Sequence, residues 1–381
     1  MLEAMGMRIL AIKNRQNELK AMEKLLARGA FPKGLVPLVE IMKADLEYDK
    51  MRDQATGEYV TEPKEIKGGK VINRKVDDPA SERDVTLARI SNLFAGHMVF
   101  VDYLRCDLGQ YKKVKHEAIG LVVELTLNKD KYVARLIEIA DYDNLMPVIA
   151  IKSGMEKLTP AEVVELVSLF HERCPERPLA IRIDELDGYE GVLQQCLNKN
   201  DFLIYDINEQ PFVSRACEYS ELRDLGLSCR TVLLCSPRER EVNNGEFMHK
   251  EYAEIIDNDA MYGFSDEGFD IYADYGGLRE KLPTGGHSKT GRALALLYDG
   301  RYSMFKSYVC QDQNLGQNGY SQIVDDILAD EDDLNPNHDC MVYEAIHAKL
   351  DRDAGMTYQD WIQYTLIRYV QQLGPSVEIS K

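Results

Sequence analysis

Short apolar runs recur along the chain, and segments with helical spacing separate most of them. The runs lie at residues 7–13, 35–42, 97–104, 145–151, 179–185, 202–208, 230–236 and 269–275. Runs of this length are typical of buried parallel strands, and helices between them provide the crossovers that parallel pairing requires. Because the runs number eight, the pattern predicts an α/β fold with a closed, TIM-barrel-like parallel barrel.

Helix signals agree with this alternation. Residues 17–26 carry apolar side chains at helical spacing, while Thr159 and Pro160 provide a cap residue and a first-turn proline for a later helix. Asn128 is placed to cap another helix. The run 121–127 is ambiguous between a strand and a buried helix, because periodicity alone does not separate them. A ninth strand there would favour an open doubly wound sheet instead of a barrel.

The segment 43–80 interrupts the alternation with a long polar stretch. Within it, the strand-like segments 58–61 and 71–73 flank Gly68 and Gly69, which are turn residues. This arrangement predicts an inserted hairpin. Long ordered insertions of this kind are often functional.

The pattern changes again near the C-terminus. Asp299 and Gly300 separate two alternating runs, which predicts an antiparallel hairpin, and the helical segments 320–328, 341–350 and 358–373 follow it. We therefore expect a barrel domain at residues 1–284 and an α+β appendage at residues 285–381. The Gly-rich segment at residues 285–290 lacks the spacing of a phosphate-binding loop and is interpreted as a linker.

Polar side chains end the predicted strands, and the carboxyl ends of barrel strands are where active sites of this fold lie. Glu40 and Arg182 fall inside apolar runs, where an unpaired charge is costly, so they form either a mutual ion pair or part of a ligand site. The candidate catalytic residues are Glu40, Asp102, Asp206 and Asp274. The candidate ligand-binding residues are Lys13, Lys152, Arg182, Ser236, Arg238 and Tyr275.

Two kinds of ligand suit these residues. Glu40, Asp102 and Asp206 are candidate ligands for a divalent metal such as Mg²⁺ or Mn²⁺, which would activate water while the cations hold a phosphoester. Taken alone, Asp206 and Asp274 are also explained as turn-capping residues. The segment 236–238 (SPR) forms either an anion-binding site or an ordinary turn.

Composition narrows the function further. The net charge of -18 opposes non-specific coating of nucleic acid, so nucleic acid is expected only through a partner or a local groove. No apolar run approaches the length of a membrane span, and the start lacks a signal peptide, so a cytoplasmic location is expected. The eight cysteines contain no CxxC pair, which argues against a structural zinc site.

Three short segments follow one another near the start of the chain: 9–13 (ILAIK), 18–21 (ELKA) and 36–41 (VPLVEI). Together they resemble the opening of the beta protein family of tailed phages and its bacterial relatives. Short segments later in the chain follow the order expected of that family: Phe100-Val101-Asp102, Met146-Pro147-Val148, Arg182-Ile183, Asp206-Ile207 and Ala273-Asp274-Tyr275. Ala273 departs from the family's Gly-Asp-Tyr, and no Asn-His-His motif follows Trp361.

The resemblance implies a role in phage–host conflict or antiphage defence, beside a nuclease-like protein encoded nearby. In this interpretation the strand ends bind a phosphorylated or nucleotide-like ligand. Two alternatives stay open: a metal-dependent phosphodiester hydrolase or nuclease that acts by itself, and a non-catalytic interaction subunit that docks through the hairpin and the appendage.

Overall fold

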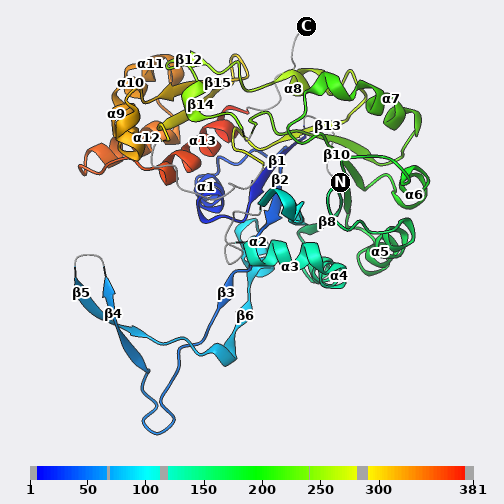
Figure 1. Ribbon diagram of the computed structural model, residues 1–381, viewed down its shortest axis with the longest axis horizontal. Helices are drawn as coiled ribbons and strands as arrows, with labels where there is room; N and C mark the ends of the chain where they lie inside the picture. The colour runs from blue at the N-terminus through cyan, green and yellow to red at the C-terminus, as the bar shows by residue number, and fades with distance from the viewer. Residues whose placement is uncertain (1–6, 67–68, 112–118, 240, 281–290, 374–381) are drawn as a thin grey trace.

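A closed barrel of parallel strands forms the centre of the molecule (Figure 1). The computed structural model describes residues 7–66, 69–111, 119–239, 241–280 and 291–373. The strands follow one another around the barrel in the order β1-β13-β11-β10-β9-β8-β7-β2. Their bounds are β1 Arg8–Lys13, β2 Leu35–Ile41, β7 Val99–Tyr103, β8 Leu145–Ile151, β9 Ala180–Ile183, β10 Phe202–Asp206, β11 Arg230–Leu234 and β13 Ile271–Asp274. The predicted eight-stranded parallel barrel is confirmed.

Pairing between the first and last strands closes the barrel. In β1, Ile9 lies opposite Ala273 of β13, and on its other side Lys13 lies opposite Glu40 of β2. The first and last of the eight predicted strands, at 7–13 and 269–275, are therefore neighbours, as closure of the barrel requires.

Helices on the outside of the barrel bury its outer apolar face. They are α1 Gln16–Ala27, α2 Thr86–Leu93, α3 Gly120–Leu127, α4 Lys129–Glu138, α5 Pro160–Arg173, α6 Glu190–Cys196, α7 Ala216–Asp224 and α8 Asp259–Gly263. The predicted caps form, since the side chains of Asn128 and Thr159 accept hydrogen bonds from main-chain N–H groups of α4 and α5.

The ambiguous run 121–127 is helical, in α3. Val122 and Leu125 are buried, whereas Leu127 is 69% exposed. A barrel strand would be buried on both faces, but a surface helix buries one side only. There is thus no ninth barrel strand in this run.

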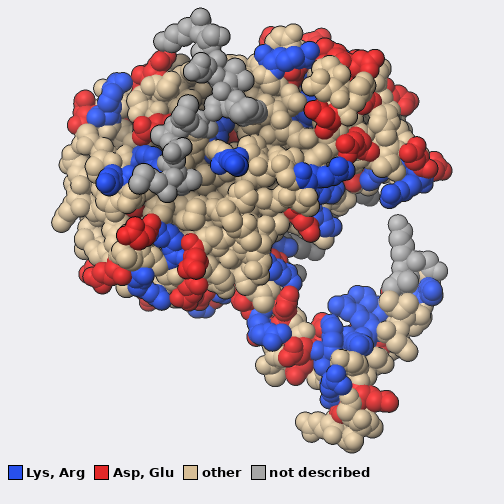
Figure 2. All heavy atoms as spheres, turned by 180° about the vertical axis from the view of Figure 1, so that it is seen from behind, with Lys and Arg blue, Asp and Glu red and all other residues tan. Residues whose placement is uncertain are grey.

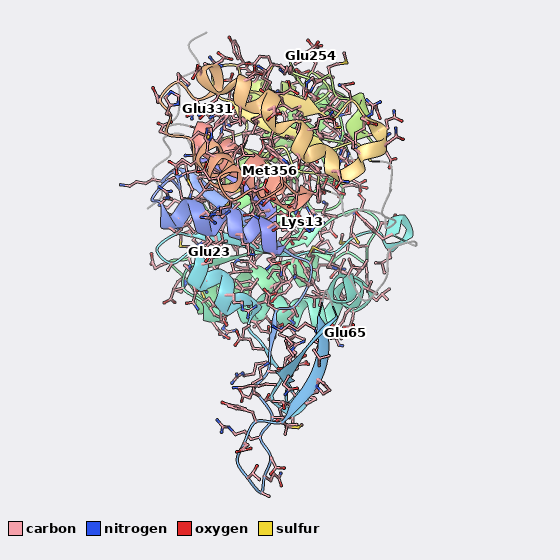
Figure 3. All side chains as sticks on the ribbon, turned by 90° about the vertical axis from the view of Figure 1, so that its left-hand side faces the viewer. Lys13, Glu23, Glu65, Glu254, Glu331 and Met356 are labelled. Carbon is pink, nitrogen blue, oxygen red and sulfur yellow. The ribbon has the colours of Figure 1, made fainter. Side chains whose placement is uncertain are left out.

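The insertion forms a long arm that stands away from the body of the molecule (Figures 1 and 2). Strands β3 Leu46–Glu47 and β6 Arg83–Asp84 pair at its base, and β4 Thr61–Ile66 pairs with β5 Lys70–Lys75 farther out. In Figure 3, Glu65 is labelled in this arm and Lys13 in the barrel. The predicted hairpin is confirmed, although Gly68 of its turn lies outside the described residues.

The C-terminal part forms the α+β appendage predicted from the sequence. Its sheet has the order β12-β15-β14, and helix α13 packs between β14 and α1. The remaining bounds are β12 Glu251–Tyr252, β14 Leu294–Asp299, β15 Met304–Val309, α9 Gly319–Gln322, α10 Val324–Ala329, α11 Glu331–Leu334, α12 Met341–Leu350 and α13 Tyr358–Gln372. Strand β12 precedes β13 in the chain, so the appendage's sheet crosses the predicted boundary at residue 284. The predicted linker at 285–290 lies outside the described residues.

The appendage is held tightly to the barrel through α13. Lys24 of α1 donates a hydrogen bond to Gln363 (2.8 Å), and the hydroxyl of Tyr369 donates to Asp274 of β13 (2.7 Å). Gly277, at φ +81°, follows β13, and a Cβ there would lie 2.6 Å from the ring of Phe305 in β15. Glycine thus allows the appendage's sheet to approach the barrel wall closely.

No helix in the described part of the chain combines the length and the apolar character needed to cross a membrane.

Candidate functional site

Along each barrel strand, successive side chains point alternately into the barrel and out of it, as strand geometry requires. Its apolar layers contain Ile9, Ala11, Leu38, Phe100, Val148, Ala180, Ile204, Leu234, Ile271 and Ala273, among others. Continuing the same two-residue step reaches a polar layer at the carboxyl ends, which consists of Lys13, Glu40, Asp102, Lys152, Arg182, Asp206, Ser236 and Tyr275. The barrel is therefore apolar below and charged at the end where sites of this fold form.

Arg182 lies at the centre of this layer. Its Nη1 donates to Glu40 Oε1 (2.8 Å) and Asp102 Oδ2 (2.7 Å). Its Nε and Nη2 both donate to Asp206 Oδ2 (2.9 and 2.6 Å). Arg182 is 1% exposed, so this ion pairing takes place almost without water. The predicted Glu40–Arg182 pair exists, and it is one part of a larger cluster.

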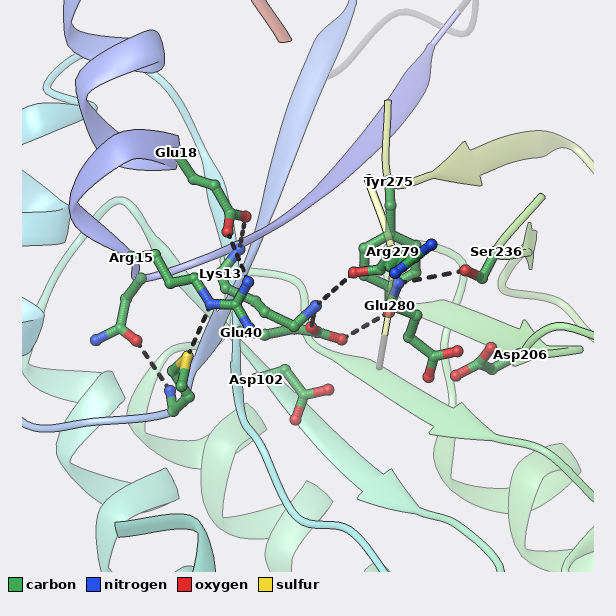
Figure 4. Close-up of polar contacts among 12 residues, drawn as sticks. Lys13, Arg15, Glu18, Glu40, Asp102, Asp206, Ser236, Tyr275, Arg279 and Glu280 are labelled. Carbon is green, nitrogen blue, oxygen red and sulfur yellow. Dashed lines mark hydrogen bonds and ion pairs between the residues drawn. The ribbon is translucent and has the colours of Figure 1, made fainter. Parts of the chain in front are cut away.

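Lys13 and Tyr275 complete one side of the cluster. Lys13 Nζ lies 3.0 Å from Glu40 Oε2 and 4.7 Å from the centroid of the Tyr275 ring. The Tyr275 hydroxyl donates to Glu40 Oε1 (2.7 Å). Figure 4 shows Glu40 between the two residues. Glu40 is thus held from three sides, by Lys13, Tyr275 and Arg182.

Lys152 and Glu280 complete the other side. Lys152 Nζ lies 2.7 Å from Asp206 Oδ2 and 3.2 Å from Glu280 Oε1. Glu280 comes from the loop after β13, and its main-chain N–H donates to Ser236 Oγ (3.3 Å). The carboxylates of Asp206 and Glu280 lie side by side in Figure 4, so Lys152 balances two negative charges.

The cluster divides its carboxyl groups into two classes. Burial acts to raise the pKa of Glu40, but Lys13 and Arg182 outweigh it and lower that pKa to about 2. At Asp206, burial likewise acts to raise the pKa, but Arg182 and Lys152 outweigh it, so the pKa is lowered. In contrast, burial dominates at Asp102 and Glu280 and raises their pKa values. Each of these two also has one buried oxygen, Oδ1 of Asp102 and Oε2 of Glu280, that has no hydrogen-bond partner among the described residues.

A cleft of about 460 Å³ opens over the carboxyl ends of the strands. Its lining comes from the loops after β7, β8, β9, β10, β11 and β13: Leu104, Arg105, Cys106, Asp107, Tyr111, Lys152, Ser153, Met155, Asp184, Asn208, Glu209, Gln210, Glu239 and Glu280. Lys152 and Glu280 belong to both the cluster and the cleft. A carboxyl group with a raised pKa at the wall of a cleft is suited to donate or accept a proton, and Glu280 is that group here.

Arg105 provides a second cation at the cleft wall. It is 3% exposed, and its Cζ lies 4.5 Å from the centroid of the Tyr132 ring. Nη2 donates to the main-chain oxygen of Glu156, while Nε and Nη1 are buried and find no hydrogen-bond partner in the described part of the chain. Buried guanidinium N–H groups rarely stay unpaired, so these donors are suited to an oxygen-rich ligand.

Two of the predicted site residues lie outside the cluster. Asp274 is out of phase with the interior positions Ala273 and Tyr275, so its side chain faces the outer layer and accepts from Tyr369 of α13. Asp274 therefore belongs to the outer layer and not to the polar layer that contains Lys13. Arg238 lies beyond Ser236 and contacts main-chain and side-chain oxygens of neighbouring loops instead of the cluster.

The three predicted metal ligands, Glu40, Asp102 and Asp206, do come together. However, the guanidinium of Arg182 lies between them and bonds an oxygen of each. Among the residues that the structure describes, no group of three or more His, Cys, Asp or Glu side chains is arranged to hold a metal ion. The arrangement fits an internal cation, and it does not favour the predicted metal site.

Sequence reasoning missed three residues that the structure brings to this region: Arg105, Glu280 and Glu18. Glu18 accepts a hydrogen bond from the main-chain N–H of Lys13 (2.6 Å). Arg105 and Glu280 lie just beyond the ends of apolar runs, in loops whose paths no periodicity specifies. Glu18 did carry a signal, because it lies on the buried face of α1 together with Ala21, Met22 and Leu25.

Comparisons with known proteins leave the family open. No family model matches the chain, and no curated protein matches it. The resemblance to the beta protein family therefore stays a hypothesis.

The two classes of carboxyl group predict different responses to substitution and pH. Because its pKa is lower in the folded state than in the unfolded state, Asp206 stabilises the fold at pH values above its unfolded-state pKa of about 3.8. This contribution is lost as the pH falls toward the folded-state pKa. At neutral pH, Asp206→Asn should cost about 3 kcal/mol of unfolding free energy. Asp102→Asn should cost about 1 kcal/mol or less, because burial already favours the neutral form that asparagine resembles.

Urea unfolding of the wild type and both variants, at neutral pH and at roughly pH 3, measures this difference. The gap between the two variants should narrow at the lower pH, where the Asp206 contribution is partly lost in the wild type as well. Equal losses of unfolding free energy in both variants at neutral pH would contradict the division of these carboxyl groups into two classes.

Proposed function

We propose that this protein binds a phosphorylated, nucleotide-like ligand in the cleft at the strand ends and acts in phage–host conflict with a nuclease-like partner. The observation that carries the proposal is the presence of buried, unpartnered guanidinium N–H groups of Arg105 at the wall of a cleft that Lys152 also lines. Paired N–H donors and a nearby ammonium are the groups that recognise phosphoryl oxygens.

The acidic residues of the cleft complement this anion-binding end. Asp184 accepts from the main-chain N–H of Ser153 (2.9 Å), and Asp107, Glu239 and Glu280 also contribute to the lining. Carboxylates accept hydrogen bonds from hydroxyl and exocyclic amino groups but repel phosphate. A nucleotide carries both kinds of group, so its phosphate suits Arg105 and Lys152 while its sugar and base suit the acidic part.

The alternative of a hydrolase that acts through Glu40, Asp102 and Asp206 receives less support. Those carboxylates are buried below the cleft and pair with Arg182. They balance the charge of an internal cation, and none of the three lines the cleft. Proton transfer by Glu280 is the chemistry that the geometry favours if the bound ligand reacts.

The arm is the part of the molecule that best suits a protein partner. Val71 and Ile72 in β5 are 59% and 40% exposed, and every residue of β5 is exposed. A projecting ribbon with apolar side chains on its surface offers both apolar contact and unpaired strand edges. We assign the contact with the nuclease-like partner to this surface.

Ligand binding is tested by calorimetric titration with nucleoside mono-, di- and triphosphates. Arg105→Gln should weaken the best ligand by about tenfold or more, because a charge-assisted hydrogen bond to phosphate is lost. Lys131→Gln is the control. The Lys131 side chain is 57% exposed and paired with Glu124, so its loss should leave the affinity unchanged. Failure of every nucleotide to bind the wild type, or equal binding by Arg105→Gln, would refute the proposed site.

The partner is tested by expressing the chain with its neighbouring genes and purifying it under native conditions. A nuclease-like protein should co-purify with the wild type, whereas the double substitution Val71→Glu and Ile72→Glu should release it with little change in melting temperature. Val213→Glu changes a side chain that is 72% exposed on the body and serves as the matched control. Recovery of the chain alone from the native operon would count against the partner role.

A further inference from the structure

Two arginines outside the cleft carry charge that no described carboxylate balances. Arg238 follows β11, and Arg279 follows β13. Arg238 Nη1 donates to the main-chain oxygen of Gly277 (3.1 Å), and its Nη2 donates to Asn244 Oδ1 (3.4 Å). Arg279 Nη2 donates to the main-chain oxygen of Val242. Each guanidinium thus contacts the loop that carries the other, and the acceptors of these hydrogen bonds in the described part of the chain are neutral oxygens.

Both guanidinium groups retain unused donors. The Nε atoms of Arg238 and Arg279 are buried and have no hydrogen-bond partner among the residues that the structure describes. Burial and the neighbouring charge of Arg279 lower the pKa of Arg238 to about 10, and the groups that act in the opposite direction are the phenols of Tyr320 and Tyr358. Two neighbouring like charges repel each other, and an anion that binds both removes this cost.

A third arginine reaches the same loop. Arg292 lies against Gly245, where a Cβ would be 3.5 Å from its Cδ and 3.6 Å from its Nε. The main-chain oxygen of Arg292 accepts from Asn244 Nδ2 (2.8 Å), so Asn244 connects this arginine with Arg238. Arg182 and Lys152, in contrast, are paired with carboxylates.

We propose that Arg238 and Arg279 form a second anion site, which binds a phosphoryl group and is separate from the strand-end cleft. Neither residue lines that cleft. Phosphate and pyrophosphate suit the site because each carries several negative charges to meet at least two guanidinium groups. The Phe247 ring packs near this guanidinium, with its centroid 5.5 Å from Arg238 Cζ.

The simpler role is a structural clamp, in which each arginine only fastens the opposite loop. A clamp stabilises the fold to the same extent whatever anion is present. An anion site instead gains stability when phosphate is added, because a ligand that binds only the folded state shifts the unfolding equilibrium. The two roles therefore differ in how the melting temperature depends on phosphate.

The test titrates inorganic phosphate and pyrophosphate into the full chain at constant ionic strength, with chloride as the balancing salt, and follows both heat of binding and melting temperature. The wild type should bind pyrophosphate, and Arg238→Gln and Arg279→Gln should each weaken binding by about ten- to a hundredfold. Arg173→Gln, at an exposed arginine paired with Asp141, should bind like the wild type. Equal phosphate stabilisation in all four proteins, or none in the wild type, would overturn the proposal.

A second measurement avoids any variant that fails to fold. Phenylglyoxal modifies accessible arginines, and peptide mass spectrometry reports the rate at each position in the wild type. Pyrophosphate should slow modification of Arg238 and Arg279 severalfold and leave Arg173 unchanged. Protection that is uniform over all three residues, or absent, would contradict the site. Because Arg105 is not involved, this outcome is independent of ligand binding in the cleft.

Discussion

The structure depends above all on the buried guanidinium of Arg182 and the carboxylates that surround it. Removing these charges from water costs several kcal/mol for each ion, and only close pairing recovers that cost. Four of the barrel's strands contribute directly, because β2, β7, β9 and β10 carry Glu40, Asp102, Arg182 and Asp206. The carboxyl end of the barrel is therefore closed by an ionic layer above an apolar one.

This layer also determines what the cleft above it is able to do. Lys152 and Glu280 belong to both, so a ligand that contacts either residue changes the electrostatic balance around Asp206 and Arg182. The unequal carboxyl groups follow from the same balance: direct pairing keeps Glu40 ionised, whereas burial raises the pKa of Glu280 at the cleft wall. The distribution of charge around Arg182 thus determines both the pairing within the layer and the proton-transfer role proposed for Glu280.

Much of this was predictable from sequence, because strand burial and side-chain alternation are local properties. The apolar runs identified all of the barrel strands, and counting by two from Ile9 or Ile204 reaches Lys13 and Asp206 in the polar layer. The same counting excludes Asp274, which is one residue out of phase with Tyr275. Loop residues such as Arg105 and Glu280 were beyond prediction, since their positions depend on tertiary contacts and not on a repeating pattern.

The most direct test of the central role of Arg182 is a double-mutant cycle between Arg182→Met and Asp206→Leu, measured as unfolding free energy. Arg182→Met alone removes the cation that Glu40, Asp102 and Asp206 share and should cost about 3–5 kcal/mol. If the two side chains depend on each other, the double variant should lose at least about 1 kcal/mol less than the sum of the single losses. Additive losses would show that Arg182 and Asp206 act independently, and they would contradict the central role of the Arg182 guanidinium in this fold.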